Sequence, residues 1–192
     1  MIKMIKVSYK ERDAAVDILY KSFIDILIPN SINFVVKKGG DRKKRLKALM
    51  RYQVDIALHY GNVYLSDDGK ACVIYLEKSQ SGIKKIMLEI QLVLECIGLS
   101  RITKVLTRER LIKAHHPKEP FVHLWLMGVI PEDQGKGKGT RLLEETMRIY
   151  SNKLIYVETT TPENLRFYQK NGFSIFHETQ ELDYPLYFLS YV

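Results

Sequence analysis

The chain is poor in the residues that mark extracellular and metal-binding proteins. Only two of its 192 residues are cysteines. Cys72 and Cys96 lie inside apolar, periodic segments without neighbours at metal-ligand spacing, so we expect buried, reduced thiols in a cytoplasmic protein and no metal site. The longest apolar run, residues 86–99, is interrupted by three polar residues, which argues against a membrane span. Residues 1–6 have no long apolar core, so a signal peptide is not expected.

Acidic residues are in the minority, with 22 Asp and Glu against 30 Lys and Arg. The excess lies in residues 1–120, which carry 23 basic and 13 acidic residues, whereas residues 121–192 carry 7 and 9. Residues 42–47 and 101–118 are the densest basic clusters. A solvated basic face is the expected fate of such runs, and attraction of an acidic substrate, a cofactor phosphate or nucleic acid is the alternative. The clusters lack regularly interleaved aromatic residues, which argues against nucleic-acid binding.

Hydrophobic periodicity predicts strands and helices in a single domain spanning residues 1–192, and 46% hydrophobic content suits a sizeable core. Strands are predicted at residues 2–7, 62–66, 70–77, 121–130, 154–159, 173–182 and 186–192. Helices are predicted from the Ser8/Glu11 capping box to Pro29, between Asp41 and Gly61, at 82–114 with a break near Gly98, at 140–150, and from Pro162 to Asn171. The unit formed by residues 121–159 predicts a parallel strand pair in an α/β (α+β) fold.

The most informative segment, residues 121–140, runs from an apolar strand through an acidic turn into three alternating glycines and then a helix. Gly135, Gly137 and Gly139 allow close backbone approach to a ligand. The amides that begin the helix have no intrahelical partner, and the helix dipole favours an anion. This segment therefore predicts a site for a phosphorylated ligand, with a flexible turn before a helix as the alternative.

Spacing excludes the two commonest nucleotide loops. A P-loop requires glycine where Ile130 and Glu132 stand, and the G-x-G-x-G pattern is not a dinucleotide fingerprint. The pattern Gln134-x-x-Gly137-x-Gly139 instead resembles the pyrophosphate-binding signature of the GNAT superfamily of acyl-CoA-dependent N-acyltransferases.

A second segment strengthens that resemblance. Glu158-Thr159 is followed by Asn164-x-x-Phe167-Tyr168-x-x-x-Gly172-Phe173, which is similar to the family's segment after the next strand. Two matches at this separation are more specific than either alone. The likeness is strong over residues 121–192, and its paired form most resembles the puromycin N-acetyltransferase branch.

The resemblance implies the GNAT acyltransferase fold, a mixed and mostly antiparallel sheet of about seven strands with a splayed parallel pair, flanked by helices. Residues 1–120 would form the acceptor-side half and residues 121–192 the acyl-CoA-binding half. Acetyl-CoA would be the cosubstrate, with its pantetheine arm between the splayed strands. The residues implied in cofactor binding are Met127, Gly128, Val129, Gln134, Gly135, Lys136, Gly137, Lys138, Gly139, Thr140 and Asn164.

Acyl transfer to an amine requires a base for the amine and an acid for the departing thiolate. Tyr168 occupies the position of the family's tyrosine and is the candidate acid, with a packing tyrosine as the alternative. Glu158, at the end of its strand, and His123 are candidate bases. Glu158 could instead anchor a cationic substrate. Strand periodicity places His123 on one face with Trp125 and Met127.

Three further expectations concern neighbouring residues. Phe167 and Phe173 are expected in the core. Gly128, inside an apolar strand, is compatible with a bulge or a close backbone approach. The adjacent His115 and His116 are expected to face solvent.

The sequence therefore predicts a cytoplasmic enzyme that transfers an acyl group, with acetyl expected, from coenzyme A to a primary amine of a small molecule or peptide. The alternative is a non-catalytic acyl-CoA-binding module with a basic partner surface. We expect a monomer or homodimer that binds neither membrane nor metal.

Overall fold

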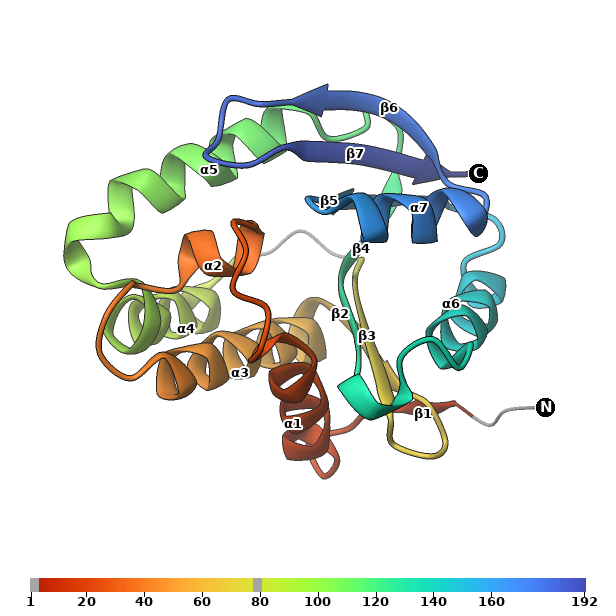
Figure 1. Ribbon diagram of the computed structural model, residues 1–192, viewed down its shortest axis with the longest axis horizontal. Coiled ribbons are helices and arrows are strands. Elements are labelled where there is room, and N and C mark those ends of the chain that lie inside the picture. Colours follow the sequence, from red (N-terminus) through yellow and green to blue (C-terminus); the bar gives the residue numbers. More distant parts are fainter. Residues whose placement is uncertain (1–3, 78–80) are drawn as a thin grey trace.

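The computed structural model describes residues 4–77 and 81–192, which form one seven-stranded sheet with helices on both faces (Figure 1). The strand order is β1-β2-β3-β4-β5-β7-β6. The strands are β1 (Ile5–Lys6), β2 (Gly61–Leu65), β3 (Ala71–Leu76), β4 (Phe121–Val129), β5 (Leu154–Thr159), β6 (Ser174–Thr179) and β7 (Leu186–Tyr191). The first residues of the strand expected at 2–7 lie outside the described part.

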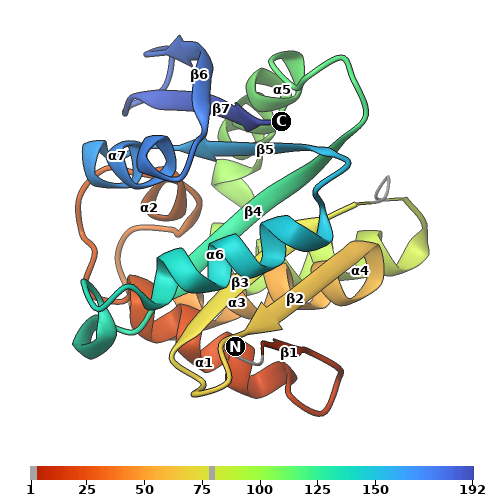
Figure 2. The same cartoon turned by 90° about the vertical axis from the view of Figure 1, so that its right-hand side faces the viewer.

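All strand pairs are antiparallel except β4 and β5. That parallel pair has only three residue pairs in register, from Phe121↔Leu154 to His123↔Tyr156. Beyond His123 the two strands separate, and Figure 2 shows them diverging in direction. The backbone edges facing this gap are therefore free of strand partners, as the expected splay requires.

The helices are α1 (Arg12–Phe23), α2 (Ser31–Val35), α3 (Arg42–Tyr60), α4 (Ile83–Leu92), α5 (Ile102–Ala114), α6 (Lys138–Ile149) and α7 (Pro162–Lys170), with short helical turns at Val93–Ile97, Leu99–Arg101 and Pro131–Asp133. Helices α1 and α3 pack on one face of β2–β4, and α6 covers the other (Figure 2). None of the helices in residues 4–77 and 81–192 is long and apolar enough to cross a membrane.

Most predicted elements are confirmed, but the segment before α3 differs. Helix α1 ends at Phe23 instead of continuing to Pro29, and the short helix α2 follows it. Asn30 caps α2 by accepting a hydrogen bond from the Asn33 amide at 2.8 Å. A five-residue helix is too short to show an apolar period, so the sequence pattern did not predict it.

The basic cluster at 42–47 is partly built into this segment. Asp41 caps α3 as predicted, accepting from the Lys44 amide at 3.0 Å. The Arg42 guanidinium turns back and donates to the Ile26 carbonyl at 2.9 Å and to Asn33 Oδ1 at 3.0 Å. The Arg42 N–H groups thus satisfy hydrogen-bond acceptors near α2. Arg42 is therefore not a free cation that opposes the dipole at the start of α3.

The cluster at 101–118 contains similar interactions. Arg101 donates to the Val36 carbonyl at 2.8 Å. Arg108 is buried, with 7% of its surface exposed, and donates to the Tyr184 hydroxyl at 2.8 Å. The expectation of a solvated basic face is therefore wrong for these arginines, because they hold helices and loops around the sheet.

A bulge in β4 changes which side chains share a face. Ile74 pairs with Leu126 and Tyr75 pairs with Leu124, so Trp125 is the extra residue. Trp125 packs on the α1/α3 side and Met127 on the α6 side. The expectation that His123, Trp125 and Met127 share one face is thus wrong for Met127, because one inserted residue reverses the alternation that follows it.

Gly128 lies beyond the bulge and marks a close approach between β4 and α1. A Cβ atom added there would lie 2.7 Å from Ser22 Oγ and 2.8 Å from Ser22 Cβ. The absence of a side chain at Gly128 is therefore explained by helix packing, which is the close backbone approach that the sequence suggested.

We expect Gly128→Ala to lower the free energy of unfolding by about 1–3 kcal/mol, the usual cost of overpacking a close contact. The reason is that the new methyl group must displace Ser22 and with it α1. Urea unfolding of both proteins measures the difference. An unchanged midpoint and slope would show that α1 moves away at no cost and would contradict this packing argument.

Candidate active site

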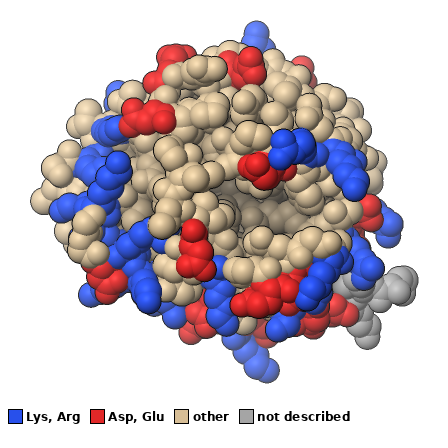
Figure 3. Space-filling model, viewed as in Figure 1, with Lys and Arg blue, Asp and Glu red and all other residues tan. Residues whose placement is uncertain are grey.

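A cleft of about 1840 Å³ opens between α2, α3 and α5 on one side and β4, β5, α6 and α7 on the other. Figure 3 shows the hollow near the centre of this face, lined mainly by uncharged residues. Because β4 and β5 separate at this point, the cleft reaches the middle of the sheet. This is the usual kind of location for a ligand, a concave site where strand pairing is interrupted.

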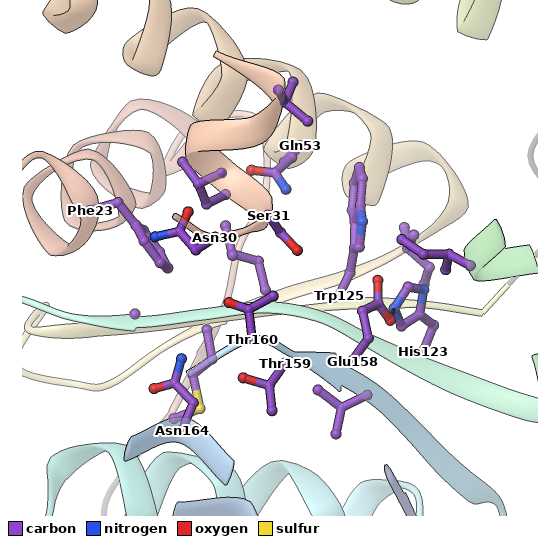
Figure 4. A pocket seen from close by; sticks show the side chains of 18 of the residues that line it. Phe23, Asn30, Ser31, Gln53, His123, Trp125, Glu158, Thr159, Thr160 and Asn164 are labelled. Carbon is purple, nitrogen blue, oxygen red and sulfur yellow. Dashed lines mark hydrogen bonds and ion pairs between the residues drawn. The ribbon is translucent and has the colours of Figure 1, made fainter. Parts of the chain in front are cut away.

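His123 and Glu158 form a hydrogen-bonded pair in this cleft. His123 Nε2 lies 2.7 Å from Glu158 Oε2, with 11% and 9% of the two side chains exposed. His123 is the last β4 residue that pairs with β5, and its partner there is Tyr156. Glu158 follows Tyr156 along β5 and points towards His123 (Figure 4). The two residues that the sequence offered as alternative bases are therefore one unit.

The charge state of Glu158 follows from its surroundings. Burial alone would raise the pKa of Glu158, but His123, followed by Arg108 and His116, outweighs burial and lowers that pKa below its ordinary value of 4.5. Glu158 is thus a carboxylate at neutral pH. Since a carboxylate only accepts hydrogen bonds, the His123 Nε2 atom must carry the proton between them, and Nδ1 is left as the acceptor in the neutral ring.

His116 also belongs to this site, contrary to the expectation that it faces solvent. Its ring packs edge-on against Phe121 and Tyr156, with centroids 5.1 Å away in each case, and it lines the cleft. Burial, followed by the nearby His123, lowers the pKa of His116. The neighbouring His115 stacks on His177 with centroids 3.8 Å apart. Both histidines are turned inward because the chain folds back from α5 to β4.

Helix α7 places Tyr168 and Asn164 one turn apart on the cleft. Tyr168 is 7% exposed and packs in the core beneath α6, and its hydroxyl has no hydrogen bond among the described residues. Burial, followed by nearby Tyr75 and Glu158, raises its pKa, so the phenol stays protonated at neutral pH. Phe167 and Phe173 pack in the same core, as predicted.

The glycine loop lies at the other end of the cleft. Gly135 and Gly137 have φ angles of +74° and +76°, and a Cβ atom at either would have nothing within 4 Å. Gly137 caps α6, which begins at Lys138, two residues earlier than predicted. Within the part of the chain that the structure describes, the amides of residues 135–140 make no hydrogen bond. They form a row of free donors at a helix N-terminus, which suits the phosphate groups of a ligand.

Side chains fix this loop to the sheet. Gln134 donates from Nε2 to the Val129 carbonyl at 3.0 Å. Lys138 forms ion pairs with Asp133 at 2.7 Å and with Asp68 at 2.6 Å. These contacts hold the end of β4, the loop and the β2–β3 turn together before any ligand binds. Lys136 is 61% exposed, and its Nζ atom lies 3.5 Å from Asp133 Oδ1.

Sequence reasoning missed several residues on the helical side of the cleft. Tyr52 and Trp125 pack edge to face with centroids 6.2 Å apart, and Gln53 and Ser31 line the same space (Figure 4). A signal for Gln53 was present, since it lies at helical spacing between Leu49 and Ala57 in the apolar stripe of α3. A polar residue inside such a stripe indicates either a buried hydrogen bond or a ligand.

No group of three or more His, Cys, Asp and Glu residues in 4–77 and 81–192 is placed to hold a metal ion. Cys72 and Cys96 are buried free thiols, as predicted. His123, Glu158 and Tyr168 are the titratable residues that the sequence offered for proton transfer, and all three line this cleft.

Comparison with known proteins agrees with this geometry. Residues 89–175 match the family model of the acetyltransferase (GNAT) domain. A structure from Corynebacterium glutamicum, described as histone acetyltransferase HPA2 and related acetyltransferase, is similar with a TM-score of 0.73 and 17% identity, covering 98% of this chain and 94% of that one.

Two insect enzymes are also similar in fold. Arylalkylamine N-acetyltransferase 2 from Aedes aegypti has a TM-score of 0.65 and 15% identity, with 100% of this chain and 98% of that chain covered. The polyamine N-acetyltransferase of Drosophila melanogaster, which forms N-acetylagmatine, has a TM-score of 0.61 and 14% identity, with 100% and 99% covered. Residues 89–175 therefore match an acetyltransferase domain of the GNAT type, and the splayed sheet and the glycine loop agree with that match.

Proposed function

We propose that this protein transfers an acetyl group from acetyl-CoA to a primary amine of a small molecule or peptide by direct attack of the amine on the thioester. One observation carries the proposal: a buried His123–Glu158 pair lies where β4 and β5 separate, in the same cleft as the free amides of the glycine loop. A base and a phosphate-binding loop are thereby joined by one continuous space.

The residues of this chain fit coenzyme A as the cosubstrate. The free amides of residues 135–140 would receive its pyrophosphate, and the backbone of residues 127–129 and Asn164 would bind its pantetheine arm. Bound there, acetyl-CoA supplies the thioester that is cleaved. The similar insect enzymes act on arylalkylamines and polyamines, which supports a small amine as the acceptor.

Proton movements follow from the charge states. An amine is protonated in neutral solution and must lose a proton before it can attack. In the proposal, His123 Nδ1 accepts this proton, and the Glu158 carboxylate orients the ring and stabilises the cation formed. Tyr168 donates a proton to the departing thiolate, since its raised pKa keeps the phenol protonated. The proton lost by the amine and the one gained by the thiolate balance.

A binding module that uses a basic surface for partners is less consistent with the structure. Arg42, Arg101 and Arg108, from the two basic clusters, hydrogen-bond within the fold and are not free for a partner.

The direct test of the proposed function is release of free thiol when the protein is mixed with acetyl-CoA and a panel of primary amines. No thiol release with any amine, despite coenzyme A binding, would contradict enzymatic function. The resemblance to the puromycin N-acetyltransferase branch stays a prediction.

We expect Gly137→Val to weaken coenzyme A binding by about 10- to 150-fold, the loss of one hydrogen bond to a charged group. Valine disfavours the positive φ angle that directs the loop amides, and its side chain fills the open space above them. Calorimetric titration with coenzyme A measures the change.

Gly69→Val is the matched control. Gly69 has a φ angle of +64° and equally open surroundings, but it lies in the β2–β3 turn. The substitution Gly69→Val imposes similar backbone strain and should leave coenzyme A affinity unchanged. Equal affinities for Gly137→Val and the unmodified protein would remove the glycine loop from the proposed cofactor site.

A further inference from the structure

The acceptor side of the cleft, defined as the part between α2, α3, α5 and the face of β4 and β5 that carries His123 and Glu158, has apolar walls. Trp125 and Tyr52, packed edge to face, are both only partly buried there. Ile28 and Leu106 line the same space and are 52% and 48% exposed. A ligand that covers these side chains removes apolar surface from water, so the walls favour an apolar body.

The carboxylates on the acceptor side already have partners within the chain. Among the described residues, Glu77 pairs with Lys153, Glu89 with Lys85 and Glu109 with Arg108, and Glu158 accepts a hydrogen bond from His123. The remaining carboxylate, Glu119, is exposed in the loop before β4. An acceptor with several ammonium groups would need an unpaired carboxylate for each additional charge, because burying an unpaired ammonium group is costly. The lining therefore favours an acceptor with a single amine.

Gln53 is a polar side chain among these apolar walls. It is 6% exposed, it lines the cleft, and its Oε1 atom has no hydrogen-bond partner within residues 4–77 and 81–192. In Figure 4, Gln53 lies on the helical side of the cleft and Glu158 on the strand side, with Trp125 alongside. A buried amide without a partner is destabilising, so its presence points to a group on the ligand. Because the unpartnered Oε1 atom is an acceptor, the complementary group is a hydrogen-bond donor, and a hydroxyl or an amide N–H on the apolar body meets this requirement.

We propose that the acceptor is a monoamine with an aromatic or branched apolar body, and that Gln53 determines specificity by hydrogen-bonding one neutral polar group on that body. The inference rests on the proposed function and names the substrate class of the same site. Trp125 and Tyr52 contact the body, and the amine points towards the His123–Glu158 pair. Gln53 acts on binding and does not take part in the proton transfers.

The test is a comparison of kcat/KM for four amines, with acetyl-CoA and thiol detection: 2-phenylethylamine, its 3-hydroxy and 4-hydroxy derivatives, and spermidine. We expect at least one hydroxylated amine to exceed 2-phenylethylamine by about two- to twelvefold, the effect of one net hydrogen bond. All three aromatic amines should exceed spermidine. Gln53→Leu should abolish the preference for the hydroxyl group, mainly through KM, and leave 2-phenylethylamine nearly unchanged.

Gln91→Leu is the matched control, since Gln91 is exposed on α4 and lies outside this cleft. It should keep the wild-type preference. If Gln53→Leu fails to fold, Gln53→Met makes the same test with a flexible side chain of similar length that lacks the amide. A preference for spermidine, or a hydroxyl preference that survives in the folded Gln53 variant, would overturn the inference while leaving acetyl transfer intact. Coenzyme A binding without thiol release from any amine would instead overturn the proposed function.

Discussion

Tyr168→Phe should lower kcat by about 10²- to 10⁴-fold, the usual contribution of a general acid, if departure of the thiolate limits the rate. Phenylalanine keeps the ring that packs beneath α6 and removes only the hydroxyl. Because the hydroxyl makes no hydrogen bond among the described residues, the melting temperature and coenzyme A affinity should stay close to those of the unmodified enzyme. The loss should appear in kcat, since the proton is needed only in the transition state.

Tyr75→Phe provides a control within the same core. The Tyr75 hydroxyl is buried, lies 2.8 Å from Thr146 Oγ1, and does not line the cleft. Its removal should cost about 1 kcal/mol of stability without lowering kcat. We thus expect opposite patterns: Tyr168→Phe lowers kcat and keeps stability, whereas Tyr75→Phe lowers stability and keeps kcat. A Tyr168→Phe protein that is fully active and stable would show that water, or release of the unprotonated thiolate, replaces the acid.

Glu158→Gln and His123→Ala should each lower kcat, and together they should lose little more than His123→Ala alone. Loss of a general base typically costs about 10²- to 10⁴-fold. If Glu158 acts by orienting His123 and stabilising its cation, the carboxylate has nothing left to act on once the imidazole is removed, so the losses are not additive. Steady-state kinetics of the four proteins in the cycle measures this coupling, with coenzyme A affinity as the check on folding.

The dependence of the Glu158 effect on pH follows from the lowered pKa of this carboxyl group. Its ionised form is present at neutral pH, and its contribution is lost only as the pH falls through that lowered value. Titration of the carboxyl group itself should therefore not change the ratio of wild-type to Glu158→Gln rates between about pH 6 and about pH 9, and a change of the ratio in that range reports the His123 cation that Glu158 stabilises. Glu144→Gln, an exposed change on α6, should not alter the rate. Fully additive losses in the cycle would mean that Glu158 acts separately from His123, for example by binding the amine.

The structure around the glycine loop could be predicted from the sequence because its signals are local. The apolar strand β4, the glycine loop and the start of α6 are consecutive in the chain, and each has its own pattern. Gly135 and Gly137 show the positive φ angles that such a loop requires. Asn164 and Tyr168 share one face of α7 because they are four residues apart in a helix, which the sequence also predicts.

The arrangement of the candidate base depended on contacts between distant residues. His123 and Glu158 are on different strands, and only the short register between β4 and β5 brings them to 2.7 Å. The same is true of His116, which turns inward where the chain returns from α5 to β4. The sequence identified His123 and Glu158 individually, but no local pattern states which residue of one strand lies beside which residue of the next.

The order of the main strands and helices, the glycine loop and the residue types available for proton transfer could be predicted from the sequence, because these depend on neighbours within one or two turns of the chain. Contacts between distant segments place Met127 and Trp125 on opposite faces, bury Arg108 against Tyr184 and bring Gln53 to the acceptor side. A β-bulge, a buried hydrogen bond and the wall of a cleft are each set by packing between segments far apart in the chain, and the free energy of that packing is not encoded in any one segment.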